Sequence, residues 1–206
     1  MNFEYAKENM VKQQILTAGV QLGALIDAIL AVPREDFLPT ELKSLAYSDS
    51  NLEIKGRLVR SPMLMARILD ALNVKSSDKV LKLGLESGYV TAVIAQLVQS
   101  VEVLDYSEEE LQESAKVIKN LNIDNVEHAS VEKLADYIAN NEQFDCIYIS
   151  NEVEDGEVEE SLLGLLKVGG KMTFTVKKPD FSKVYIVTKT SDDSFDKKFL
   201  FDVYNK

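Results

Sequence analysis

The segment at residues 80–89, VLKLGLESGY, has the residue types of a ligand-binding turn. An apolar run ends at Gly84, and Gly88 follows four residues later, where a helix is expected to begin. Glycines let the backbone approach a ligand closely, and the first N–H groups of a helix attract an anion. Glycines are also common in strand-to-helix turns that bind nothing, so the loop alone leaves a purely structural role open.

A second candidate, Asp105, lies near the end of the apolar segment VEVLDY, about 20 residues after the loop. An acidic side chain at this distance can accept hydrogen bonds from both hydroxyls of a ribose. The alternative is a carboxylate that caps the helix expected at SEEEL. Taken together, the loop and Asp105 favour a cofactor that carries a nucleoside.

The composition narrows the class of protein. A chain of 206 residues suits one domain. Its 34 acidic and 23 basic residues give a net charge of -11, which disfavours nucleic acid as a partner. No apolar run approaches the roughly 18 residues of a membrane helix, and the N-terminus lacks the features of a secretory signal. We therefore expect a cytoplasmic protein with no membrane partner.

A metal site and a reactive thiol are both disfavoured. His128 is the only histidine, and no cysteine or carboxylate stands at a zinc-ligand spacing from it. The only cysteine, Cys146, lies in the strand-like segment FDCIYIS, where a buried and inert thiol is expected.

The loop and Asp105 belong to a regular alternation of predicted elements. From residue 79, the strand-like segments KVLKLG, VEVLDY, FDCIYIS and KMTFTVK alternate with helices expected to start near Gly88, Ser107, Val131 and Gly156. This alternation predicts an α/β fold with a parallel, doubly wound sheet. Two further segments, KVYIVTK and KKFLFDVY, follow with no helix between them and predict antiparallel strands at one edge.

The N-terminal third has a different rhythm. Residues 2–31 show the apolar spacing of two amphipathic helices, and VPREDFLP then interrupts the pattern with two prolines. Another helix is expected from Met63, after Pro62. The expected organisation is one compact domain, in which a helical region at 1–74 covers the cleft of a Rossmann-like core at 75–206.

Several segments resemble those of a known family in their order and spacing. They are MVKQQI, VPREDF, AYSD, SPMLMARIL, GLESGYVTAVIAQLV and LLKVGGKM. From about residue 8 onward the chain resembles the protein-L-isoaspartate O-methyltransferases. The resemblance implies a Rossmann-like seven-stranded fold with an N-terminal helical extension, and S-adenosylmethionine as cofactor. It also implies methyl transfer to the carboxylate of isoaspartyl residues in damaged proteins, which would be the partners.

The resemblance also suggests where the cofactor binds. The residues implied are Lys82, Gly84, Glu86, Ser87, Gly88, Asp105 and Glu132. Of these, Glu132 would lie near the adenine amino group, or it could simply be a carboxylate at a helix N-terminus. The family usually has an acidic residue in place of Lys82 and a third glycine in place of Glu86.

Those two departures suggest a charge exchange. We hypothesise that Lys82 attracts the cofactor's carboxylate, or pairs with Glu86, while Glu86 takes the cofactor's ammonium. The alternative is that both positions drifted after cofactor binding was lost, which would leave a degenerate paralogue acting as a binding or scaffold protein.

The segment expected to bind the substrate also differs from the family's usual sequence. The family's threonine-isoleucine-serine stretch is replaced here by Leu58, Val59 and Arg60. Arg60 and Ser61 are the candidate catalytic residues: a guanidinium can clamp a carboxylate bidentately, and Ser61 could supply a shifted hydroxyl. Alternatively, Arg60 points to solvent. A carboxylate nucleophile is already ionised at pH 7, so the reaction needs positioning rather than a general base.

Overall fold

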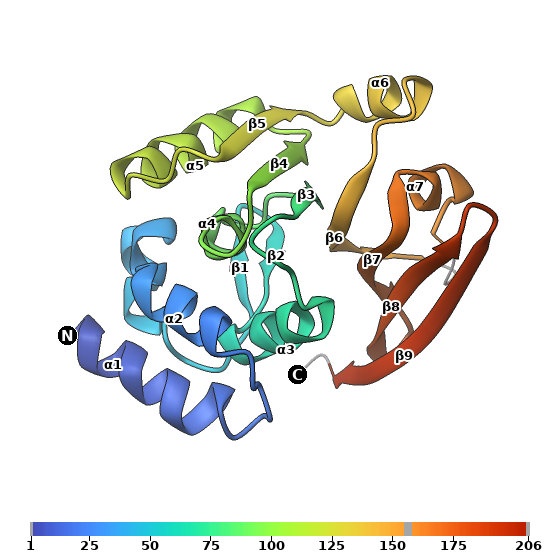
Figure 1. Ribbon diagram of the computed structural model, residues 1–206. Helices are drawn as coiled ribbons and strands as arrows, with labels where there is room; N and C mark the ends of the chain where they lie inside the picture. The colour runs from blue at the N-terminus through green and yellow to red at the C-terminus, as the bar shows by residue number, and fades with distance from the viewer. Residues whose placement is uncertain (1, 155–157, 205–206) are drawn as a thin grey trace.

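A seven-stranded sheet forms the centre of the computed structural model, which describes residues 2–154 and 158–204 (Figure 1). The strand order is β5-β4-β3-β6-β7-β8-β9. The strands are β3 (Lys79–Leu83), β4 (Ser100–Asp105), β5 (Val126–Ser130), β6 (Phe144–Val153), β7 (Leu166–Lys177), β8 (Phe181–Ser191) and β9 (Ser194–Tyr204). The first five strands of that order pair in parallel, whereas β8 and β9 are antiparallel. The predicted fold class and the antiparallel edge are both confirmed.

Helices occupy most of the predicted positions. They are α1 (Phe3–Met10), α2 (Gly23–Ala31), α3 (Pro62–Leu72), α4 (Tyr89–Ala95), α5 (Glu108–Asn120), α6 (Lys133–Ala139) and α7 (Glu160–Gly164). A π-helical turn at Val11–Ile15 extends α1, and 3-10 turns at Arg34–Phe37 and Thr40–Leu45 follow the prolines. The helix expected near Gly156 begins at Glu160, and Gly156 itself lies outside the described residues.

The two faces of the sheet bury different sets of side chains, because successive residues of a strand point to opposite faces. In β3, Val80 belongs to the apolar cluster that includes residues of α1 to α4, while Leu81 belongs to the cluster that includes apolar side chains of α6 and α7. Figure 1 shows α1 to α4 on one side of the sheet and α6 and α7 on the other. Both faces are therefore covered, as a largely parallel sheet requires.

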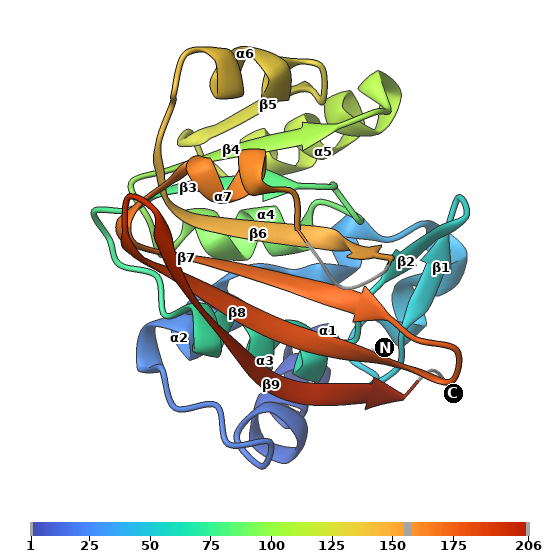
Figure 2. The ribbon, with the colours of Figure 1, turned by 90° about the vertical axis from the view of Figure 1, so that its right-hand side faces the viewer.

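The chain order produces a switch point at the carboxyl ends of β3 and β6. From β3 the chain runs outward to β4 and β5 and then returns to place β6 beside β3. Ligands of open α/β sheets bind at such a point. A separate two-stranded hairpin, β1 (Leu52–Ile54) and β2 (Arg57–Val59), stands at the end to which the arrowheads of β6 and β7 point (Figure 2). The domain boundary near residue 75 stays a prediction.

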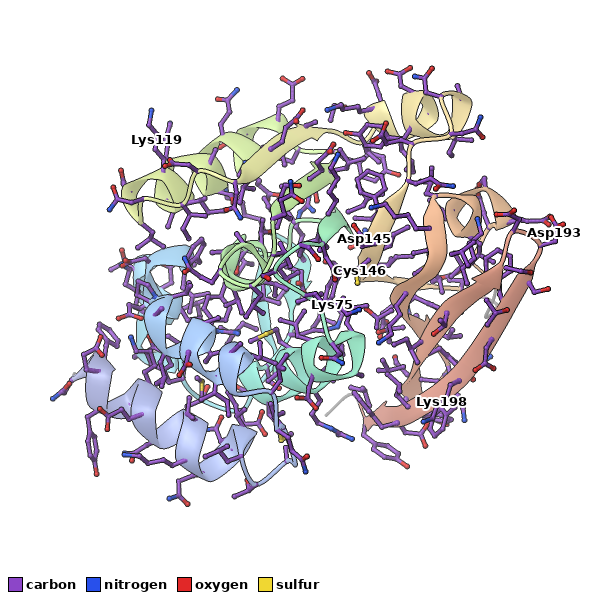
Figure 3. All side chains as sticks on the ribbon, in the orientation of Figure 1. Lys75, Lys119, Asp145, Cys146, Asp193 and Lys198 are labelled. Carbon is purple, nitrogen blue, oxygen red and sulfur yellow. The ribbon has the colours of Figure 1, made fainter. Side chains whose placement is uncertain are left out.

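The opposite end of β6 holds the only cysteine. Cys146 lies beside Lys75 and Asp145 at the start of β6 (Figure 3). Its thiol is buried and donates to Asp78 at 3.7 Å, and burial raises the pKa of Cys146 to about 12. A thiol that stays protonated at neutral pH is a poor nucleophile.

Within residues 2–154 and 158–204, no helix is long and apolar enough to cross a membrane. The same ranges contain no group of three or more histidine, cysteine, aspartate or glutamate side chains placed to hold a metal ion.

Candidate functional site

The GLESG turn connects β3 to α4 through two glycines in the left-handed region. Gly84 and Gly88 both have φ of 87°. A Cβ atom on Gly84 would lie 3.1 Å from the Cβ of Ser150, and one on Gly88 would lie 2.3 Å from the Oγ of Ser114. Both glycines are therefore required by the turn itself and by its close approach to β6 and α5.

Replacing Gly88 with alanine should lower the free energy of unfolding by about 2–3 kcal/mol, through left-handed strain and the overlap with Ser114. Gly169 is a matched control, because its φ is 84° and a Cβ there would meet nothing within 4 Å. Urea denaturation of Gly88→Ala and Gly169→Ala measures the difference. Equal losses in the two variants would show that the approach to Ser114 has no cost.

Glu86 occupies a third left-handed position in the same turn, with φ of 58°. Its side chain is buried, and its Oε1 accepts a hydrogen bond from Arg60 at 2.9 Å. Its Oε2 lies 3.7 Å from the Nζ of Lys82 and has no hydrogen-bond partner. A non-glycine residue rarely adopts this backbone conformation, which is strained. The ion pairs of the Glu86 carboxylate with Arg60 and Lys82 help to hold the residue in it.

Lys82 is fully buried beneath the turn. Its ammonium donates to the carbonyl oxygens of Gly84 and Leu85 and to the Oγ of Ser150 at 2.8 Å. Burial lowers the pKa of Lys82 to about 8, although the nearby Glu86 opposes this shift. Of the two roles hypothesised for Lys82, the structure contains the pairing with Glu86.

The two candidate catalytic residues are neighbours in the chain but face different surroundings. The Arg60 side chain is 3% exposed and its guanidinium pairs with Glu86, so it does not point to solvent. The Oγ of Ser61 accepts from the backbone N–H of Leu64 at 3.3 Å and caps α3. Ser61 lines a different hollow, next to Arg67. Arg60 is therefore brought to the loop and Ser61 is not.

Asp105 ends β4 beside the loop, and its carboxylate accepts four hydrogen bonds. The backbone N–H groups of Leu85 and Ser107 donate at 2.7 and 3.0 Å. Arg57 donates two more, one to each oxygen, both at 2.7 Å. Burial acts to raise the pKa of Asp105, but the hydrogen bonds from Arg57 and the backbone outweigh it and lower the pKa. Ser107, whose Oγ accepts from the N–H of Glu110, is the N-cap of α5.

Two hollows meet at Glu86. The first, of about 350 Å³, is lined by Gly56, Arg57, Leu58, Glu86, Tyr106, Ser150, Asn151 and Glu152. The second, of about 340 Å³, includes Ile54, Lys55, Glu86 and Ser87 together with residues of α5. The first lies at the carboxyl ends of β3, β4 and β6, where a cofactor is expected.

Some lining residues were not predicted from the sequence. Tyr106 and Ser150 are the last residues of the predicted strand segments VEVLDY and FDCIYIS, so their positions at the carboxyl ends of strands are a signal in the sequence. Arg57 carried none, because its contact with Asp105 joins residues 48 apart in the chain. Glu132, in contrast, is exposed at the start of α6 and lines neither hollow. Its position is that of the alternative interpretation, a carboxylate at a helix N-terminus.

The donors and acceptors fit a nucleoside-bearing cofactor, provided that Arg57 moves. The two contacts from Arg57 show that both oxygens of Asp105 can receive donors side by side, as a ribose diol requires. The exposed ring of Tyr106 lines the adjoining hollow and offers a flat apolar face. Oε2 of Glu86 is an unused buried acceptor that suits an ammonium.

Comparison with known proteins identifies the family. The profile of the protein-L-isoaspartate(D-aspartate) O-methyltransferase family matches residues 5–204. The protein-L-isoaspartate O-methyltransferase of Dictyoglomus thermophilum is 31% identical over 197 residues, covering 94% of this chain and 86% of that protein. The enzyme of the same name from Geobacter metallireducens is 31% identical over 199 residues, covering 94% of this chain and 89% of its own.

Solved structures agree on the fold. A Plasmodium falciparum structure, named as a protein-L-isoaspartate O-methyltransferase in complex with S-adenosyl-L-homocysteine, superposes with a TM-score of 0.78. It is 23% identical, and the match covers 98% of this chain and 96% of that one. A second structure of the same enzyme name has a TM-score of 0.80 at 22% identity, covering 96% of this chain and 64% of its own. The chain belongs to the protein-L-isoaspartate(D-aspartate) O-methyltransferase family.

Proposed function

We propose that this protein transfers a methyl group from S-adenosylmethionine to the carboxylate of isoaspartyl residues in damaged proteins. The observation that carries the proposal is Asp105. This chain belongs to the family, and its Asp105 lies at the end of β4, next to the GLESG turn and a hollow of about 350 Å³. Each of the two oxygens of Asp105 accepts a hydrogen bond from Arg57. The named relatives carry the same activity in their names.

In this proposal the cofactor supplies an activated methyl group, and the chain supplies its placement. Asp105 would accept from the ribose hydroxyls, and Gly84 and Gly88 would allow close approach of the turn. Oε2 of Glu86, which has no hydrogen-bond partner within the chain, would accept a hydrogen bond from the cofactor's ammonium. Lys82 would not contact the cofactor but would hold the turn in shape, by donating to the carbonyl groups of Gly84 and Leu85. Ser87, in the same turn, and Glu132, near the adenine, stay proposed contacts.

Methyl transfer to the substrate needs no general base, because the accepting carboxylate is ionised at neutral pH. Orientation and exclusion of water therefore determine the rate. Arg60 cannot clamp a substrate carboxylate while it pairs with Glu86 at 2.9 Å. Leu58 lines the hollow with 41% of its surface exposed and offers no hydroxyl. We therefore expect transfer to be slow compared with relatives that keep the threonine and serine.

A second candidate is a cofactor-binding or scaffold protein with lost catalysis. It is favoured by one observation: Arg60, Glu86 and Lys82 already form a buried ion-pair cluster at the turn, where the cofactor's ammonium is proposed to bind. Methyl-transfer assays distinguish the two candidates.

The assay uses S-adenosylmethionine labelled in its methyl group, with an isoaspartyl peptide and the same peptide containing ordinary aspartate. We expect a base-labile methyl ester on the isoaspartyl peptide alone. Leu58→Thr should raise the rate roughly fivefold, the worth of about one hydrogen bond. Arg60→Ser should be tested together with Glu86→Gly, so that no buried carboxylate loses its partner.

A result at the level of a protein-free blank, for the wild type and for both sets of variants, would eliminate the repair activity and leave the scaffold role. The proposed setting is the cytoplasm, with isoaspartyl proteins as partners. The net charge of -11 disfavours nucleic acid among those partners.

A further inference from the structure

The β1–β2 hairpin is anchored by Leu52 and Val59 in the apolar core and by ion pairs near its tip, not by a larger sheet. It is a two-stranded sheet of its own, with Glu53 opposite Leu58 and Ile54 opposite Arg57. Two-stranded hairpins are marginally stable alone, so other contacts must hold this one. Its tip, Lys55 and Gly56, is in the left-handed region at both residues.

Ion pairs join this hairpin to the end of β4 and the first turns of α5. Arg57 binds Asp105 through two hydrogen bonds of 2.7 Å, and its Nε lies 2.7 Å from the Oε2 of Glu110. Lys55 lies 3.1 Å from Glu113 and 3.8 Å from Glu109. The Arg57–Asp105 pair is the least solvated of them, with side-chain exposures of 27% and 1%.

The hairpin also forms a wall of both hollows. Arg57 and Leu58 line the hollow at the switch point, whereas Ile54 and Lys55 line the one against α5. A movement of the hairpin tip would therefore change access to both hollows at once.

We propose that the β1–β2 hairpin is a latch on the nucleoside site, in which Arg57 competes with a ribose for the two oxygens of Asp105. The latch rests on the proposed function, because that function supplies the ribose. A guanidinium places two parallel N–H groups on a carboxylate, which is the donor arrangement that a ribose diol would need. Both cannot occupy the same two oxygens.

Release of Arg57 from Asp105 does not leave its charge unpaired. Its Nε can stay beside Glu110 while the hairpin moves, since Glu110 lines the hollow against α5 and not the one at the switch point, and its side chain is 14% exposed. The main difference between the closed and open forms is therefore the bidentate contact with Asp105, because the side chains of the Lys55 pairs at the tip are at least half exposed and those pairs contribute little. A ligand that needs the open form binds with an affinity reduced by the fraction of protein in that form.

Calorimetric titration with S-adenosylhomocysteine tests the latch. Arg57→Gln keeps the length and polarity of the side chain but removes the charge and the fork. We expect it to tighten binding about tenfold, the value of a charged hydrogen-bond pair at its lower end. The same variant should unfold at a lower urea concentration in the absence of ligand. This combination of lower stability and tighter binding is specific to a residue that competes with the ligand.

Two variants serve as controls. Lys55→Ala removes the contacts to Glu109 and Glu113 from the same hairpin but leaves Arg57 on Asp105, so its affinity should stay within about twofold of the wild type. Arg57→Lys, which can reach Asp105 with a single ammonium, should fall between the wild type and Arg57→Gln.

The outcomes separate the latch from the proposed function. If the wild type binds and Arg57→Gln binds equally or more weakly, while still unfolding cooperatively, the latch is wrong and the cofactor site stands. If neither the wild type nor either Arg57 variant binds, the cofactor site is wrong and the latch falls with it.

Discussion

Replacing Arg60 with alanine is expected to lower the free energy of unfolding by about 3–5 kcal/mol, the loss typical of breaking a buried ion pair from one side. The Arg60 and Glu86 side chains are each 3% exposed, and Oε1 of Glu86 has Arg60 as its hydrogen-bond partner. Without the guanidinium, a buried carboxylate in a strained left-handed turn keeps only Lys82, at 3.7 Å. Urea denaturation of the wild type and Arg60→Ala measures the effect.

The double variant Arg60→Ala/Glu86→Gly should recover most of this loss, because the carboxylate and the left-handed strain are removed together. Lys12→Ala is a control at an exposed pair: the Nζ of Lys12 and the Oε2 of Glu8 are 3.1 Å apart, and the two side chains are 60% and 55% exposed. Its expected cost is below about 1 kcal/mol. Equal losses for Arg60→Ala and Lys12→Ala would contradict the buried pairing at the loop.

Replacing Lys82 with glutamate should be about as costly, at roughly 3–5 kcal/mol. The change would put a second carboxylate beside Glu86 and remove the donor to the Gly84 and Leu85 carbonyls and to Ser150. The family's usual acidic residue is therefore unsuitable here while Glu86 is present. Thermal or urea unfolding of Lys82→Glu is the measurement.

A mutant cycle identifies the cause. Adding Glu86→Gly to Lys82→Glu should restore part of the stability and should also recover S-adenosylhomocysteine binding, since the two charges are then exchanged back together. Lys82→Met, which keeps the volume without a charge, should cost less than Lys82→Glu. A single reversion that tightens ligand binding would instead show that the two positions drifted independently.

The fold could be predicted from the sequence because each pattern that indicates it lies within one short segment of the chain. Strand–helix alternation predicted the parallel part of the sheet, and the absence of a helix after KMTFTVK predicted the antiparallel edge. The sequence also predicted two parts of the site, the turn at Gly84 and Gly88 and the acidic residue at the end of β4, because each lies where one element ends and the next begins.

The connections within the site were harder to predict. The pairing of Lys82 with Glu86 could be hypothesised, because two opposite changes four residues apart compensate each other. The contacts of Arg57 with Asp105, and of Arg60 with Glu86, join residues 48 and 26 apart in sequence. Their partners depend on how the β1–β2 hairpin folds over the sheet. No local pattern fixes that arrangement, so the sequence does not point to Arg57 and does not decide whether Arg60 clamps a carboxylate or faces solvent.

Calorimetric titration of the wild type and Asp105→Asn with S-adenosylhomocysteine measures whether one nucleoside site is built around Asp105. Asn keeps the shape of the side chain but loses the charge and one acceptor oxygen. We expect one binding site per chain in the wild type and an affinity at least about tenfold lower in Asp105→Asn, the loss of about one charged hydrogen bond. Equal binding by the two proteins, or no binding by the wild type, would show that Asp105 does not form such a site.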